Sequence, residues 1–172
     1  RLQSTKDDLR YFGTGIPVWN GSLRNEFGFG RFSLSFNIQT RLGFYFFRSS
    51  FNQQSFAQRR YGHKDYAERW QNPGDELFTN VPAIRYPINS YREDFYNKSE
   101  VLIVKGDNIR LQDATINYTF KKVPYFSQLA IMGYAKNLNL ILWRANKFGI
   151  DPEYRDAVPY PMSFSLGVRG SF

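Results

Sequence analysis

The chain of 172 residues contains no cysteine and a single histidine, His63. Without thiols it cannot form a disulfide scaffold, a cysteine nucleophile or a Cys-based metal site. One histidine cannot supply a His-rich metal site. We therefore expect no metal and no cofactor.

Long apolar runs are also missing. No stretch approaches the roughly 18 consecutive apolar residues that a membrane-spanning helix requires. The chain begins Arg-Leu-Gln-Ser-Thr-Lys-Asp-Asp, without the apolar core of a secretory signal peptide. We expect it to be a piece of a longer precursor.

Basic residues are in excess but never clustered. The net charge is +8, yet no basic run is longer than Arg59-Arg60 or Lys121-Lys122. A nucleic-acid-binding protein would gather its Lys and Arg on one face or helix. We therefore expect no nucleic-acid partner and assign the excess to loops and other water-facing positions.

Aromatic residues are abundant: 17 Phe and 12 Tyr raise the aromatic fraction to 19%, while the mean hydropathy is only −0.52. This combination is typical of strands that face lipid on one side and water on the other. An aromatic-rich soluble β-sandwich has the same composition, so composition alone leaves both classes open.

The segment Phe32–Phe47 has the clearest pattern in the chain. Its even positions are apolar except for Thr40, and its first five odd positions are polar or charged. A period of two places these sets on opposite faces of a strand. Sixteen residues far exceed the usual strand of about 5–6 residues, which favours a membrane-crossing strand.

Alternation and turn residues predict an all-β chain of five antiparallel transmembrane strands, which would form part of a larger outer-membrane barrel. We expect the strands at about 22–29, 32–47, 106–120, 128–142 and 160–172. Two long polar segments, 48–105 and 143–159, are expected to be irregular extracellular loops. The turns at 30–31 and 121–127 are short, as periplasmic turns are.

Five strands cannot close a barrel, because the smallest bacterial examples have eight. Open sheet edges are costly in lipid, where unpaired backbone groups find no water. We therefore expect the remaining strands of the barrel to lie outside this chain.

No catalytic constellation is evident. His63 lies near Asp65 but has no serine or cysteine motif beside it, and the carboxylates Asp75, Glu93 and Asp94 are expected to be separate. We expect that the chain is not an enzyme and has no catalytic residue.

Four loop residues are candidates for contact with a substrate. Aromatic rings stack on sugars, and arginine pairs with carboxylates. The candidate substrate-binding residues are Tyr61, Trp70, Trp143 and Arg144. Loop packing is the alternative role for each of them.

Seven motifs, in chain order, resemble the C-terminal barrel of SusC/RagA-type TonB-dependent importers. They are the aromatic-glycine loop, hairpin and "fSLSF" strand at Tyr11–Phe46; the "RW…PGD" loop at 69–75; "VP" at 81–82; the strand KGDNIRLQDATINYTF at Lys105–Phe120; the "NL" region at 135–138; "GyDPE" at 149–153; and "YP…tfslGl" at 160–167, before the terminal Phe172. Asp113 stands where the family often has Asn, and Lys136 where it has Gln.

The resemblance implies an integral protein of the bacterial outer membrane, in contact with its lipid. These five strands would form the C-terminal part of a barrel of about 22 strands, and the N-terminal plug and the remaining strands would lie outside this chain. It would import oligosaccharides or peptides with a SusD-like surface lipoprotein as partner. The TonB complex would energise uptake through the N-terminal plug. Two alternatives stay open: a non-transporting outer-membrane barrel or adhesin, and a soluble carbohydrate-binding β-sandwich.

Overall fold

The computed structural model describes residues 7, 9–59, 62–155 and 157–172. The chain divides into two compact units. We call Thr14–Phe44 with Gly106–Phe172 the sheet unit, and Arg1–Gly13 with Tyr45–Lys105 the inserted unit.

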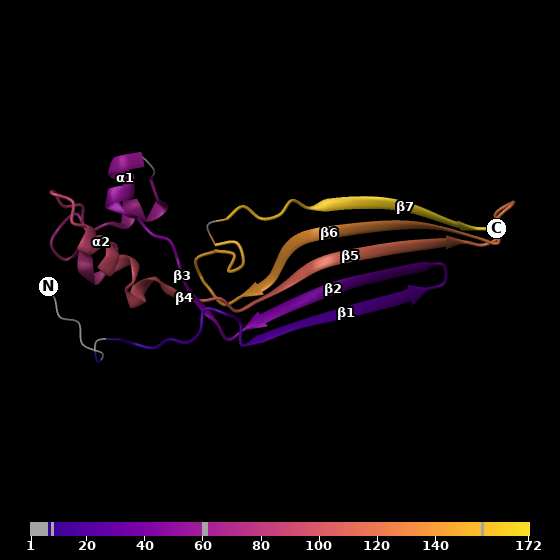
Figure 1. Cartoon of the computed structure of the whole chain (residues 1–172), viewed down its shortest axis with the longest axis horizontal. Helices are drawn as coiled ribbons and strands as arrows, with labels where there is room; N and C mark the ends of the chain where they lie inside the picture. Colours follow the sequence, from indigo (N-terminus) through magenta and orange to yellow (C-terminus); the bar gives the residue numbers. More distant parts are fainter. Residues whose placement is uncertain (1–6, 8, 60–61, 156) are drawn as a thin grey trace. The chain divides into compact units, whose positions relative to one another are not determined.

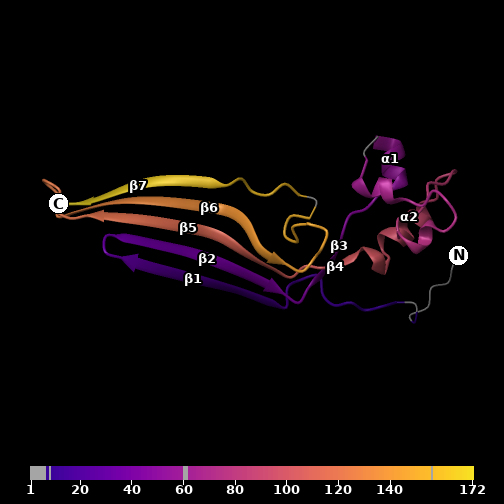
Figure 2. The same cartoon turned by 180° about the vertical axis from the view of Figure 1, so that it is seen from behind.

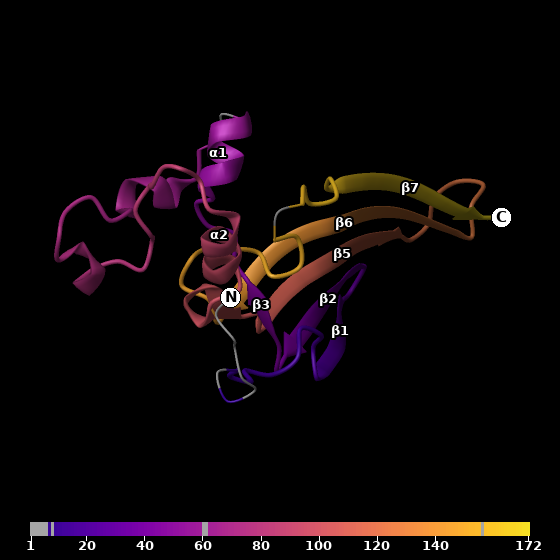
Figure 3. The same cartoon turned by 60° about the vertical axis from the view of Figure 1, so that its left-hand side comes forward.

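The sheet unit is one antiparallel sheet with the strand order β1-β2-β5-β6-β7 (Figure 1). Figure 3 shows that the sheet curves along its strands. The prediction of a five-stranded antiparallel sheet is confirmed. Its strands are β1 (Trp19–Phe29), β2 (Phe32–Leu42), β5 (Asn108–Phe120), β6 (Gln128–Arg144) and β7 (Ser163–Ser171).

Short and long connections lie at opposite ends of this sheet. The turns at 30–31 and 121–127 lie at the end that also holds the terminal Phe172 (Figure 2). The segments 43–107 and 145–162 start and finish at the other end. All the long connections therefore leave the sheet at the same end of its strands.

The register places every charged residue of the five strands on the same face. Arg24 of β1 pairs with Asn37 of β2, which pairs with Asp113 of β5, which in turn pairs with Lys136 of β6. We call this face the polar face. The other charged strand residues share it by register: Glu26, Arg41, Arg110, Arg144 and Arg169.

The opposite face, here called the apolar face, is built from Phe, Leu, Ile and Val. One row runs Leu34, Ile116, Gly133 and Leu166 across four strands. Leu166 is 79% exposed, and its neighbours on β7 are also exposed. Polar side chains are the buried ones here: Asn108, Arg110 and Asp113 lie on the polar face. This is the reverse of a soluble sheet, in which the apolar face packs against a core.

The predicted sixteen-residue strand 32–47 is wrong in one respect. It breaks at Gly43, which has a left-handed φ of 79°. The Asp107 carboxylate accepts a hydrogen bond of 2.6 Å from the Gly43 N–H, so that this group leaves the ladder. Beyond the break, β3 (Tyr45–Phe47) pairs with β4 (Ile103–Lys105) in a separate two-stranded sheet.

The segment 48–105 was predicted to be an irregular loop, but its described residues form helices, 3-10 turns and a short strand of the inserted unit. Its helices are α1 (Gln53–Arg59) and α2 (Ser90–Asn97). The 3-10 turns η2 (Lys64–Glu68) and η3 (Asp75–Leu77) lie between them, and η4 (Glu100–Leu102) follows α2. Phe46, Phe51, Val81, Leu102 and Val104 are buried in it. None of the helices that the structure describes is long and apolar enough to cross a bilayer.

Asp65 is the polar centre of the inserted unit. Its buried carboxylate accepts hydrogen bonds from the Arg48 guanidinium and, at 2.6 Å, from the Ser50 hydroxyl. Burial raises the pKa of Asp65, but the hydrogen bonds from Ser50 and Arg48 outweigh it, so the pKa lies below its usual value of 3.8. The ionised carboxylate therefore stabilises this unit.

We predict that Asp65→Asn lowers the free energy of opening of the inserted unit by about 3 kcal/mol at pH 7, because Arg48 loses its charged partner in a buried site. A group with a depressed pKa stabilises the fold above its unfolded pKa and loses that effect as the pH falls toward the folded value. The deficit of the variant should therefore shrink below pH 3.8.

Hydrogen exchange of residues 48–105, corrected for the intrinsic pH dependence of exchange, measures this. The exposed Asp94 of α2 provides the matched control, Asp94→Asn. Equal protection in the Asp65→Asn and Asp94→Asn proteins at pH 7 would contradict the role assigned to Asp65.

Candidate functional site

The candidate site of the sheet unit is built around Arg110, near the start of β5. Its side chain is fully buried and points from the polar face toward loop 145–162. Its Nη2 donates to the Asp151 carboxylate at 2.7 Å, and its Nη1 lies 2.8 Å from Glu153 Oε2. Asn108 accepts from Arg110 Nε at 3.2 Å. One guanidinium thus joins the strand to two carboxylates of the loop.

Glu153 extends the network to β2. Its Oε1 lies 3.2 Å from Arg41 Nη1, while its Oε2 faces Arg110. Arg41 and Asn108 are register partners, so the loop carboxylate bridges adjacent strands. Each ion pair is partly shielded from water, which makes it stronger than a surface pair.

Hydrogen bonds within loop 145–162 fix its conformation. The Asn146 amide donates to the Ile150 carbonyl at 2.9 Å and accepts from the Ile150 N–H at 3.1 Å. Asp151 Oδ1 accepts from the Glu153 N–H at 2.9 Å. These bonds fix the turn that presents both carboxylates to Arg110.

Tyr154 fastens the next part of the loop to β6. Its hydroxyl donates to Asn139 Oδ1 at 3.3 Å, and Asn139 Nδ2 donates to the Tyr160 carbonyl at 3.1 Å. Asn139 has a left-handed φ of 48°, which marks an irregularity of the strand. Burial, followed by the charge of Glu153, raises the pKa of the Tyr154 phenol, so it stays a neutral donor at pH 7.

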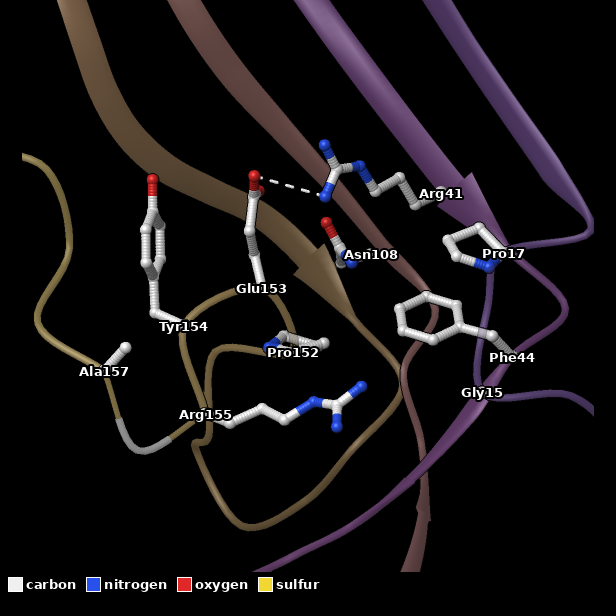
Figure 4. Close-up of a pocket in the computed structure, with 10 residues that line it drawn as sticks. All are labelled: Gly15, Pro17, Arg41, Phe44, Asn108, Pro152, Glu153, Tyr154, Arg155 and Ala157. Atoms are coloured by element: carbon white, nitrogen blue, oxygen red, sulfur yellow. Dashed lines mark ion pairs between the residues drawn. The ribbon is translucent and has the colours of Figure 1, made fainter.

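A cavity of about 610 Å³ opens beside this network (Figure 4). Arginine, glutamate and asparagine side chains line it together with proline and phenylalanine. Figure 4 shows Glu153 directed toward Arg41. The cavity can therefore hold a ligand with both polar and apolar parts. Its lining residues are Gly15, Pro17, Arg41, Phe44, Asn108, Pro152, Glu153, Tyr154, Arg155 and Ala157.

A second polar cluster lies farther along the polar face. Asp113 accepts from Arg24 Nη2 and from Asn37 Nδ2, both at 3.2 Å. Ser22 donates to Asn37 Oδ1 at 2.6 Å. Lys136 is the register partner of Asp113. The two positions that depart from the family pattern, Asp113 and Lys136, are therefore neighbours across two strands.

Of the predicted substrate-binding residues, Tyr61 lies outside the described residues. Trp70 lies in the inserted unit, where its Nε1 donates to the Thr79 carbonyl at 2.6 Å and its backbone N–H donates to Val81. The indole therefore helps to hold the segment 70–81 together. A contact of Trp70 with a substrate stays a prediction.

Trp143 and Arg144 were predicted to lie in a loop, and this is wrong. Both belong to β6, because the ladder with β5 continues to the Asn108–Arg144 pair. Trp143 lies opposite Ile109 on the apolar face. Arg144 Nη1 donates to the Gly149 carbonyl at 2.8 Å, so it supports the fold of loop 145–162.

Sequence reasoning missed the residues that the fold brings together: Arg41, Arg110, Asp151 and Glu153. A signal did exist for Arg41, which occupies a polar-face position of a predicted strand, and for the two carboxylates, which flank Pro152 in a predicted loop. None existed for Arg110, because strict alternation places it on the face opposite to Asp113. Arg110 and Asp151 lie 41 positions apart in the sequence, and this spacing does not predict their ion pair, because the pair depends on the path of the loop.

Comparison of the sequence with protein-family models and with curated proteins found no match. Among solved structures, the chain is similar to one in the structure of the RagAB peptide importer in the "open-open" state. The TM-score is 0.63 at 18% sequence identity, and the match covers 98% of this chain but 19% of that one. At this identity the likeness establishes the fold, which is that of a part of a larger chain.

We predict that Arg110→Gln loosens loop 145–162. The change leaves Asp151 without its charged partner and Glu153 with Arg41 alone, and an unpaired, partly buried carboxylate costs about 1–3 kcal/mol. Exchange of the amides of residues 146–155 should become about tenfold faster or more.

Arg169→Gln is the matched control, because Arg169 shares the polar face but lies on β7, away from the loop residues that Arg110 contacts. Unchanged exchange in the loop of the Arg110→Gln protein would show that the ion pairs do not hold it.

Proposed function

We propose that the chain is a C-terminal part of the wall of a TonB-dependent importer in the bacterial outer membrane. The observation that carries the proposal is the apolar face: none of its strand residues is buried or charged, and it spreads over five neighbouring strands. Lipid is the environment in which such a face is stable.

Strand length supports the same conclusion. A transmembrane strand requires about 9–11 residues at the usual tilt. The strands β1 and β2 have 11 residues each, β5 has 13, β6 has 17 and β7 has 9. Every strand of the sheet therefore reaches the necessary length.

The polar face would line the lumen of the barrel. Its Arg, Asp, Lys, Ser and Asn side chains bond to one another or face water, as lumen residues of outer-membrane barrels do. The free edges of β1 and β7 would pair with further strands of the full-length protein, because unpaired backbone groups are costly in lipid.

In this arrangement the long connections face the outside of the cell. The inserted unit and loop 145–162 would meet the substrate, an oligosaccharide or a peptide, and a SusD-like surface lipoprotein. The likeness to part of a peptide importer supports a transport role for the whole protein. In the importer the role of this chain is structural and non-enzymatic: it forms part of the barrel wall and part of the extracellular entrance for the substrate.

An exposed, uncovered apolar face argues against the soluble β-sandwich, since a sandwich buries that face under a second sheet. Among the described residues, only the two-stranded β3–β4 ladder exists besides the main sheet. A non-transporting barrel or adhesin is distinguished by the uptake experiment below.

We predict that Leu166→Arg impairs assembly of the full-length protein in the outer membrane, because arginine on the lipid face near the midplane costs about 2–4 kcal/mol. Ser165→Arg is the matched control: it lies next in sequence but on the polar face, in register with Tyr134. The quantity to measure is the folded, heat-modifiable protein in the outer-membrane fraction.

Equal amounts of folded protein for the two variants would contradict the assignment of the lipid face. Transport is tested separately, by comparing uptake of labelled oligosaccharides and peptides in cells with and without the full-length gene. Normal membrane assembly with no loss of uptake on deletion would favour the adhesin.

A further inference from the structure

A second cavity, of about 620 Å³, lies in the inserted unit at the segment that leads into α2. It is lined by consecutive residues: Arg85, Tyr86, Pro87, Ile88, Asn89, Ser90, Tyr91 and Arg92. We call it the tyrosine pocket. None of its residues takes part in the ionic network around Arg110.

Hydrogen bonds to the buried Gln53 side chain fix the conformation of the segment that lines the tyrosine pocket. The Gln53 amide, 1% exposed, donates to the Arg85 carbonyl at 2.7 Å and accepts from the Arg85 N–H at 3.1 Å. Arg92 Nη2 donates to Gln53 Oε1 and to the Ala83 carbonyl, both at 2.9 Å. Glu93 in turn accepts from the Gln53 N–H at 2.9 Å.

The start of α2 is fixed as well. The Asn89 side chain caps the helix by accepting from the Tyr91 N–H at 3.0 Å and from the Arg92 N–H at 3.3 Å. Such a cap stabilises a helix start by about 1 kcal/mol. The segment therefore presents its outward side chains from a rigid backbone, which lowers the entropic cost of binding a ligand.

The largest of those outward side chains are two tyrosines and an arginine. Tyr86 is 73% exposed and Tyr91 is 84% exposed. Arg85 is also exposed, and within the described part of the chain its guanidinium has no hydrogen-bond or ion-pair partner. Exposed aromatic rings on a rigid support, beside an available cation, have no role in the packing of this unit.

We propose that the tyrosine pocket binds an acidic oligosaccharide, with sugar rings stacked on Tyr86 and Tyr91 and a sugar carboxylate paired with Arg85. Tyrosine offers a flat, amphipathic surface at low entropic cost. A guanidinium recognises a carboxylate through two parallel hydrogen bonds. The net charge of +8 favours the approach of anionic solutes.

A glycan suits this pocket better than a peptide. An extended peptide binds through backbone hydrogen bonds to a strand edge or through apolar pockets for its side chains. Here the Arg85 backbone groups are already bonded to Gln53, and the two tyrosine rings are mostly exposed, so that they offer flat surfaces for stacking. The proposal names a substrate class for the proposed importer, but it concerns a separate site whose binding is measurable without transport.

The test is calorimetric titration of the full-length, detergent-purified protein with three probes. They are a galacturonic acid hexamer, the neutral maltohexaose and a hexa-aspartate peptide. The uronate should bind, and Tyr86→Ala or Tyr91→Ala should each weaken its binding about tenfold or more, as the loss of a stacking contact does. Arg85→Gln should weaken it by at least about tenfold as well, since it removes a charged hydrogen bond.

Two controls keep the outcome interpretable. Phe78→Ala removes an equally exposed aromatic ring of the inserted unit outside the pocket and should leave uronate binding unchanged. Circular dichroism should match the wild type for every variant, since all the altered side chains are exposed. The proposal is overturned if the uronate does not bind, if maltohexaose binds equally well, if the peptide binds in its place, or if the three pocket variants bind like Phe78→Ala. None of these outcomes bears on the membrane position of Leu166, so the two proposals fail separately.

Discussion

The register of the five-stranded sheet is the constraint on which the rest of the structure depends. Strand residues alternate between faces, so a slip of one position would move every charge to the opposite side. The ladder is not perfectly regular: it shifts between Leu111 and Asp113. That irregularity brings Arg110 and Asp113, which strict alternation would separate, onto one face. The charge-free apolar face therefore depends on a bulge as much as on the residue pattern.

The two units satisfy the hydrogen bonds and charges of their buried polar side chains in different ways. In the inserted unit, buried Asp65, Gln53 and Glu93 are surrounded by donors and acceptors within a small apolar core. In the sheet unit, the polar groups gather on one face, and the loop carboxylates neutralise Arg110 where the strands end. A segment whose sequence is typical of a long polar loop can therefore be well ordered, because its polar side chains form hydrogen bonds with one another and with the backbone.

Much of the sheet was predictable, whereas little of the candidate site was. The alternation of Phe32–Leu42 reports directly on the pleat of a strand, which is a local property. Gly43 looked like one more strand position, because its left-handed conformation is stabilised by Asp107, far away in the sequence. Trp143 and Arg144 were misplaced for a related reason: a ladder ends where its partner strand ends, and Asn108 sets that limit.

The sequence by itself determined the class of strand, the order of the elements and the separation of apolar from charged residues, since these follow from a period of two along the backbone. The tertiary structure alone decided which side chains meet. The contacts of Arg110 with Asp151 and Glu153, and of Gln53 with Arg85, join residues many positions apart. Such contacts depend on the path of the chain between them, which no local pattern records.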